Sequence, residues 1–151
     1  MGSMRGRGRR RWVALLAALA ALTLGSGCGD LSRDELSRGV ESLSALAAQG
    51  ELVASGVARD ATKTTYARVM AKTLGGEAEH EAEKLADATP SPEVERQRDA
   101  AVEVAGEIAE LFSELQTFPG DEHHGVLVQR HLGEAKEQAD AIVARLTGEA
   151  P

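Results

Sequence analysis

Apolar side chains recur at helical spacing along four segments of this chain. Over residues 32–58, Leu36, Val40, Leu43 and Ala47 follow at intervals of four, three and four residues, which puts them on one face of a helix. The periodicity continues over 60–88 (Tyr66, Val69, Met70, Leu74, Leu85), 92–116 (Val94, Ala101, Val104, Ala105, Ile108, Leu111, Phe112, Leu115) and 121–147 (Val128, Leu132, Ala135, Ala139, Ile142, Leu146). The pattern predicts four amphipathic helices, each with one buried stripe.

Residues that favour a helix start stand at the beginning of each segment. Ser32 and Glu35 have the spacing of a capping box, in which each side chain binds a free amide at the helix start. Asp60 and Asp121 are predicted N-caps. Pro92 suits the first position of a helix, where its missing amide hydrogen is not needed.

Glycines interrupt the first two predicted helices. Gly50 and Gly56 weaken the second half of the first helix and predict a kink or an early end. Gly75 and Gly76 lie inside the second helix, where two adjacent glycines cost on the order of 2 kcal/mol relative to alanine. A bend or break is therefore expected there.

Four helices of similar length joined by short turns predict an antiparallel, up-down-up-down four-helix bundle with coiled-coil-like packing. Composition favours this all-α fold, because Ala, Glu, Leu and Arg are abundant whereas β-branched and aromatic residues are few. The bundle is expected over 32–147, with a tether over 28–31 and a C-terminal tail over 148–151. Its length suits one compact domain.

The first 28 residues differ in composition from the rest of the chain. Met1 to Arg11 contains five arginines and no acid, and Trp12 to Leu24 is a 13-residue apolar run. This basic-then-apolar order is typical of a secretory signal peptide. A transmembrane helix needs roughly 20 apolar residues, so the run is too short to be one.

Small residues then lead to the only cysteine of the chain, in the sequence Gly25-Ser26-Gly27-Cys28. This sequence resembles the lipobox of bacterial lipoproteins, with glycine in place of the usual leucine at position 25. The resemblance implies cleavage between Gly27 and Cys28 and covalent diacylglycerol and acyl lipid, such as palmitate, on Cys28. Arg9 to Val13 also resembles the twin-arginine export signal, so this route and the general secretion route both stay open.

The chain without its signal peptide is strongly acidic. The full sequence has 17 Lys and Arg against 24 Asp and Glu, and loss of the five signal-peptide arginines leaves 12 against 24, a net charge of −12. This charge disfavours binding to nucleic acid and to acidic lipid surfaces, which both depend on basic groups. We expect no nucleic-acid partner, and no cofactor other than the covalent lipid.

Two histidine-containing segments are candidates for a metal site. Glu77 and His80 have the Glu-x-x-His spacing that ferritin-like di-iron bundles use on two of their helices. His123 and His124 follow Asp121 and form a second candidate. In the predicted topology the two segments are about 30 Å apart along the bundle axis, at 1.5 Å per residue. They are not expected to share a metal, and an exposed charged face and an acidic helix start are the simpler interpretations.

The sequence contains no Gly-x-Ser-x-Gly nucleophile elbow and no other catalytic motif. We therefore expect a non-enzymatic binding or interaction module with an envelope protein as its partner. The lipid on Cys28 would anchor this module to the outer face of the cytoplasmic membrane or to a membrane that faces the periplasm. The alternative is a metal-binding helical bundle, for storage or redox chemistry, that uses Glu77 and His80.

Overall fold

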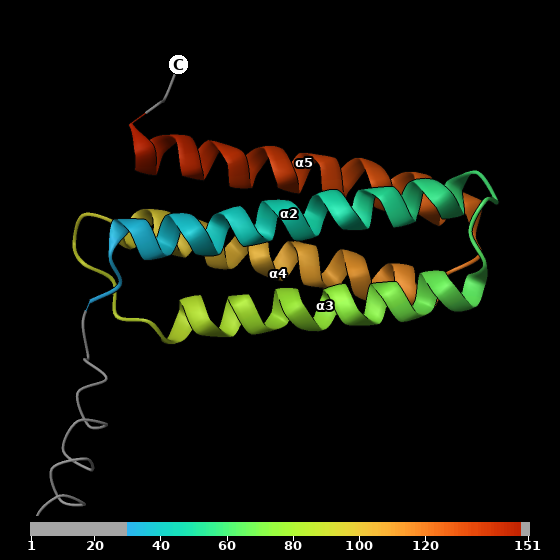
Figure 1. Cartoon of the computed structure of the whole chain (residues 1–151), viewed down its shortest axis with the longest axis horizontal. Helices are drawn as coiled ribbons and strands as arrows, with labels where there is room; N and C mark the ends of the chain where they lie inside the picture. Colours follow the sequence, from blue (N-terminus) through green and yellow to red (C-terminus); the bar gives the residue numbers. More distant parts are fainter. Residues whose placement is uncertain (1–29, 149–151) are drawn as a thin grey trace, which may run out of the picture.

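A computed structural model of the chain describes residues 30–148. These residues form four α-helices: α2 (Arg33–Ala58), α3 (Thr64–Asp87), α4 (Glu95–Thr117) and α5 (Glu122–Thr147). Each helix runs antiparallel to its neighbour in sequence, and together they form one elongated bundle (Figure 1). Within 30–148 the only β-structure is one isolated bridge. The predicted all-α four-helix bundle is confirmed.

The bundle has two different ends. One end, the loop end, contains the start of α2, the loop 88–94 and the end of α5, whereas the turn end contains the turns 59–63 and 118–121 (Figure 1). α2 packs most extensively against α5, and α3 against α4. The contacts between these two pairs are fewer, and α3 and α5 lie diagonally opposite without contact.

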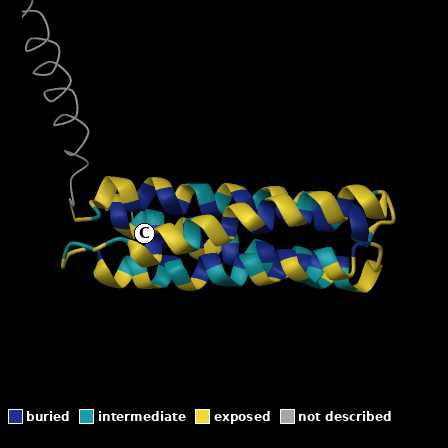
Figure 2. Ribbon diagram, turned by 90° about the horizontal axis from the view of Figure 1, so that it is seen from below, coloured by how far each residue is buried: buried dark blue, intermediate teal, exposed yellow. Residues whose placement is uncertain are grey.

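The core lies between the four helices, and each helix contributes a stripe of buried residues to it (Figure 2). Phe112 on α4 is the largest fully buried side chain. All residues predicted to face inward on the first, third and fourth helices are buried. On these three helices, the apolar periodicity located the core correctly.

Small residues bring the backbones of α2 and α5 close together. A Cβ atom added at Gly125 would lie 2.6 Å from the backbone nitrogen of Ala58, so only glycine fits there.

Polar side chains also join α2 and α5. Ser44 Oγ donates a hydrogen bond of 2.6 Å to Asp140 Oδ1, and Lys136 Nζ lies 2.6 Å from Asp140 Oδ2. The Lys136 ammonium and then the Ser44 hydroxyl lower the pKa of Asp140.

The predicted apolar face of the second helix is wrong in its first half. Tyr66 and Val69 are 55% and 56% exposed, while Ala67 is buried between them. α3 approaches α4 closely, since a Cβ atom at Gly75 would lie 3.2 Å from Phe112 Cβ. Four of the six buried residues of α3 are accordingly small: Ala67, Ala71, Gly75 and Ala78.

The second helix also begins later than predicted. α3 starts at Thr64, and Lys63 precedes it without a side-chain cap. Asp60, the predicted N-cap, has a left-handed backbone with φ 49°. Its N–H donates to Val57 O at 3.0 Å, so Asp60 belongs to the end of α2 and not to the start of α3.

The loop between α3 and α4 is held by the start of the described chain. Leu31 N–H donates to Thr89 O at 2.6 Å, and Leu31 O accepts from Ser91 N–H at 3.5 Å. The chain then forms a turn in which Val94 N–H donates to Ser91 O at 3.0 Å, and α4 begins at Glu95 rather than at the predicted Pro92. Leu31, predicted as part of a tether, is instead fixed against the bundle.

The other two predicted helix starts are confirmed. Glu35 N–H donates to Ser32 Oγ at 3.3 Å, and Ser32 N–H donates to Glu35 Oε2 at 3.0 Å, which completes the capping box. Asp121 Oδ1 accepts from His124 N–H at 2.9 Å. These backbone hydrogen bonds lower the pKa of Glu35 and of Asp121.

The glycines do not end or break the two helices that contain them. α2 is continuous through Gly50 and Gly56, and α3 is continuous through Gly75 and Gly76. Tertiary packing supplies most of the stability of a helix in a protein, so it can outweigh poor intrinsic propensity. Gly50 also has a packing role, because a Cβ atom there would lie 2.6 Å from Phe112 Cζ.

Replacement of Gly50 by alanine should destabilise the protein, although alanine is the better helix former. The added methyl group would overlap the Phe112 ring and lie 2.9 Å from Leu132 Cδ1, and overpacking of this kind costs about 1–3 kcal/mol. Gly106→Ala is the matched control, because no atom lies within 4 Å of its Cβ position, and it should gain up to about 1 kcal/mol. Chemical denaturation measures the free energy of unfolding of both variants. Equal values for Gly50→Ala and Gly106→Ala would contradict the packing described for Gly50.

Candidate functional site

The predicted lipid-attachment site lies outside the described residues. Gly27 and Cys28 precede Asp30, where the described chain begins at the loop end. Cleavage before Cys28 and its lipidation therefore stay predictions. None of the described helices is long and apolar enough to cross a membrane.

Glu77 and His80 lie on the exposed face of α3. Leu74 and Ala78 form the core side of the same stretch of helix, so Glu77 and His80 do not project between the helices as the ligands of a ferritin-like centre do. Both instead line a groove of about 470 Å³ between α2 and α3, with Ser42, Leu46, Thr73, Gly76 and Glu81.

His124 lies at the turn end, next to two acids. Its Nδ1 is 3.2 Å from Asp121 Oδ1 and its Nε2 is 3.9 Å from Glu114 Oε1. The ring stacks on Phe118 with 4.1 Å between centroids, and His123 meets it edge-on at 6.2 Å. Both histidines therefore belong to the capped first turn of α5.

These candidates do not combine into a metal site. Within residues 30–148, no group of three or more His, Cys, Asp or Glu side chains is arranged to hold a metal ion. α3 and α5, which carry the two candidate segments, have no contact with each other. The positions of Glu77, His80, His123 and His124 therefore give no geometric support to the metal-binding alternative.

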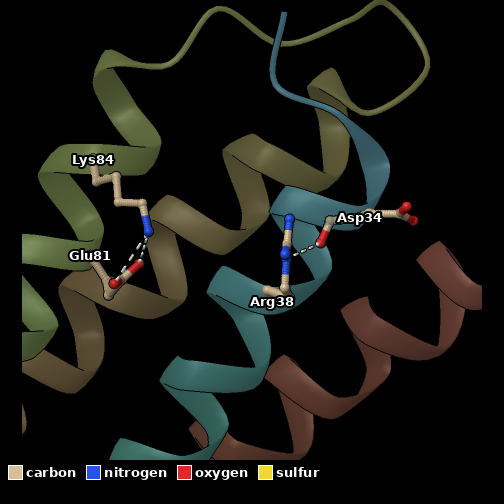
Figure 3. Close-up of polar contacts among 4 residues, drawn as sticks. All are labelled: Asp34, Arg38, Glu81 and Lys84. Carbon is tan, nitrogen blue, oxygen red and sulfur yellow. Dashed lines mark hydrogen bonds and ion pairs between the residues drawn. The ribbon is translucent and has the colours of Figure 1, made fainter. Parts of the chain in front are cut away.

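A second groove between α2 and α3 lies at the loop end and also has a volume of about 470 Å³. Leu31 and Leu85 contribute apolar lining, and four charged residues surround them: Glu35, Arg38, Glu81 and Lys84. Arg38 Nε donates to Asp34 O at 3.3 Å, and Lys84 Nζ lies 3.3 Å from Glu81 Oε2 (Figure 3). These polar contacts stay within one helix, so no ion pair closes the groove from α2 to α3 in the described chain.

The two grooves lack the parts of a hydrolytic active site. Ser42 and His80 line the same groove, but no hydrogen bond joins the Ser42 hydroxyl to the His80 ring. A hydroxyl nucleophile needs an adjacent base at hydrogen-bond distance. No serine hydroxyl that lines these grooves has a histidine hydrogen-bond partner in the described part of the chain.

In the part of the chain that the structure describes, the exposed large apolar side chains all lie at one end of the bundle. Within 30–148, five are between 43% and 76% exposed: Leu52 on α2, Tyr66 and Val69 on α3, Phe118 after α4, and Val126 on α5. All five lie within six residues of a helix terminus at the turn end, which is about 9 Å at 1.5 Å per residue. The turn end is therefore the apolar end of an otherwise polar surface.

Comparison with known proteins finds no relative of this chain. No family model matches it, and neither a curated protein nor a solved structure does. A four-helix bundle hosts many unrelated functions, so the fold does not identify one, and the inference depends on the surface of this chain.

Sequence reasoning missed the exposed apolar end because helical spacing assigned Tyr66 and Val69 to the core. Ala67, Ala71 and Ala78 recur at helical spacing too, and they form the stripe that is buried. Alanine is a weak signal of burial, since its small side chain contributes little to apolar periodicity. Recognition of the alanine stripe would have placed Tyr66 and Val69 outside.

Asp121 should stabilise the protein in a pH-dependent way. The pKa of Asp121 is lowered from 3.8, chiefly by the hydrogen bond from His124 N–H. The ionised carboxylate therefore stabilises the folded protein fully above pH 3.8, the pKa in the unfolded chain. This stabilisation is lost as the pH falls through the lower pKa of the folded protein. Asp121→Asn keeps an N-cap without the charge. The stability difference between wild type and this variant should therefore shrink between about pH 6 and about pH 2. A difference that stays constant over this range, measured by urea denaturation, would rule out this role.

Proposed function

We propose that this protein is an exported, lipid-anchored cell-envelope protein whose helical bundle is a non-enzymatic interaction module. The gathering of exposed large apolar side chains at the turn end supports the proposal most directly. Exposed apolar residues scattered singly over a surface are ordinary, whereas these five all lie at one end of the bundle. The chain without its signal peptide has a net charge of −12, which favours a protein over a nucleic acid as that partner.

The sequence before the bundle supports the anchoring half of the proposal. The lipobox-like segment places Cys28 three residues before Leu31, and Leu31 is fixed to the loop between α3 and α4. A residue spans at most about 3.6 Å, so the lipid would hold the loop end within about 11 Å of its attachment point. The bundle would thus be anchored through its loop end at the outer face of the cytoplasmic membrane or at a membrane that faces the periplasm.

Lipid attachment predicts a clear difference between the wild type and Cys28→Ser. Cells supplied with a labelled fatty acid should incorporate the label into the wild-type chain and not into Cys28→Ser, because the chain has no other cysteine. Ser37→Ala, a substitution in the bundle, is the control and should be labelled like wild type. Label in Cys28→Ser would show that the anchor is not on this thiol.

The turn end should contact a partner in the intact cell. A photoreactive amino acid at Leu52 or Val126, both exposed at the turn end, should give cross-linked adducts of defined mass. Ala45 and Ala141 are matched controls, since they are exposed on the same two helices farther from the turn end. Adducts with equal yield at all four positions, or none at any, would contradict an interaction site at the turn end.

A further inference from the structure

α3 carries its charges in two blocks of opposite sign. All charged residues in its first half, and the residue before it, are basic: Lys63, Arg68 and Lys72. The charged residues of its second half are five acids and one lysine: Glu77, Glu79, Glu81, Glu83, Lys84 and Asp87. The dipole of a helix favours the reverse order, with acids near the N-terminus and cations near the C-terminus. The arrangement therefore does not stabilise α3 itself.

Four of these charges share one flank of the helix: Arg68, Lys72, Glu79 and Glu83. At 3.6 residues per turn, they fall within an arc of about 60°. All four are exposed, and within residues 30–148 none of them forms a hydrogen bond or an ion pair. Arg68 and Lys72 are like charges four residues apart, as are Glu79 and Glu83, and such neighbours repel each other.

The four charges are also symmetric about one point. The midpoint of Arg68 and Glu83 and the midpoint of Lys72 and Glu79 both fall between residues 75 and 76. The centre of α3 falls there too, because the helix runs from Thr64 to Asp87. If a second α3 packed antiparallel about this point, each of the four charged residues would therefore face a residue of opposite charge on the other helix.

The surface at this point can receive another helix. A hollow of about 280 Å³ lies there between α3 and α4, with Lys72 and Glu79 at either side of Gly75 and Gly76. The α4 residues that line it are uncharged, namely Ala109, Ser113 and Gln116, so they offer no competing ion pair. Gly76 is exposed, and a Cβ atom there would meet nothing within 4 Å. Its missing side chain would allow a neighbouring backbone to come close.

We propose that this chain pairs with a second copy of itself, antiparallel through α3. A two-fold axis between residues 75 and 76 brings Arg68 beside Glu83 of the partner subunit and Lys72 beside Glu79 of the partner subunit. The symmetry repeats both pairs, as expected for an isologous interface. The exposed Val69 lies on the same helix, about 40° beyond the arc of the four charges, and would lie at the edge of the interface. This interface runs along α3 and is separate from the turn-end residues Leu52 and Val126, so the inference goes beyond the proposed function.

Antiparallel pairing also determines where the two anchors lie. The loop end of each bundle would stand beside the turn end of the other. α3 has 24 residues, so the two loop ends would be about 36 Å apart at 1.5 Å per residue. Anchors on both chains would reach one membrane when the bundles lie along its surface.

The test is a charge exchange on the full-length chain, in a mild non-ionic detergent, with mass measured by sedimentation velocity. Wild type should form a dimer. The double variant Arg68→Glu with Lys72→Glu has acids at all four positions, and the double variant Glu79→Lys with Glu83→Lys has lysine or arginine at all four. Two copies of either variant would repel each other at every pair, so each double variant should be monomeric. A mixture of the two double variants should form a heterodimer, and the quadruple variant should recover the homodimer. Circular dichroism of every variant checks that the helices are intact.

A disulfide trap provides a second measurement in intact membranes. Gly76→Cys lies next to the proposed axis, so oxidation should link two chains through this residue, whereas Ala141→Cys on the opposite side of the bundle should not be linked. Wild type controls for Cys28, the only native cysteine. A monomeric wild type, a dimer unaffected by charge reversal, or equal linking of both cysteine variants would each overturn the α3 interface. Lipid labelling of Cys28 and cross-linking at Leu52 would still report on the proposed function separately.

Discussion

The close approach of helices within two pairs, α2 with α5 and α3 with α4, is the constraint on which this structure depends. Gly125 lies against the backbone of α2, and Gly75 lies against Phe112 on α4, where an added Cβ atom would have little or no room. Gly125 and Gly75 allow this approach, because they have no side chain. Phe112 is fully buried in the core and in turn requires glycine at position 50.

This packing also decides what the surface offers. Two grooves of about 470 Å³ each lie between α2 and α3, where the tight pairs meet each other with fewer contacts. The alanine face of α3 turns Tyr66 and Val69 outward. Charged groups line the grooves, and apolar groups gather at the turn end. Within residues 30–148, no group of three or more His, Cys, Asp or Glu side chains on this surface is arranged to hold a metal ion.

α3 shows how stability and surface chemistry can be separated in a bundle. Its charge order opposes the helix dipole, its like charges are neighbours, and Gly76 adds flexibility without a packing role in the chain. The helix is nevertheless continuous, because burial of one face stabilises it more than these local terms weaken it. The outer face is therefore free to carry a pattern that favours binding.

Local patterns in the sequence determined the four helices, their antiparallel order, the capping box at Ser32 and the buried stripes of three helices. Periodicity and capping act over a few residues, so a single sequence contains them. The separation of His80 from His123 and His124 followed from the same topology. Only the tertiary structure decided which face of α3 is buried, whether α3 continues through Gly75 and Gly76, and that Leu31 is fixed to the neighbouring loop. These features depend on the distance between helix axes and on contacts between residues far apart in the chain, which no local pattern records.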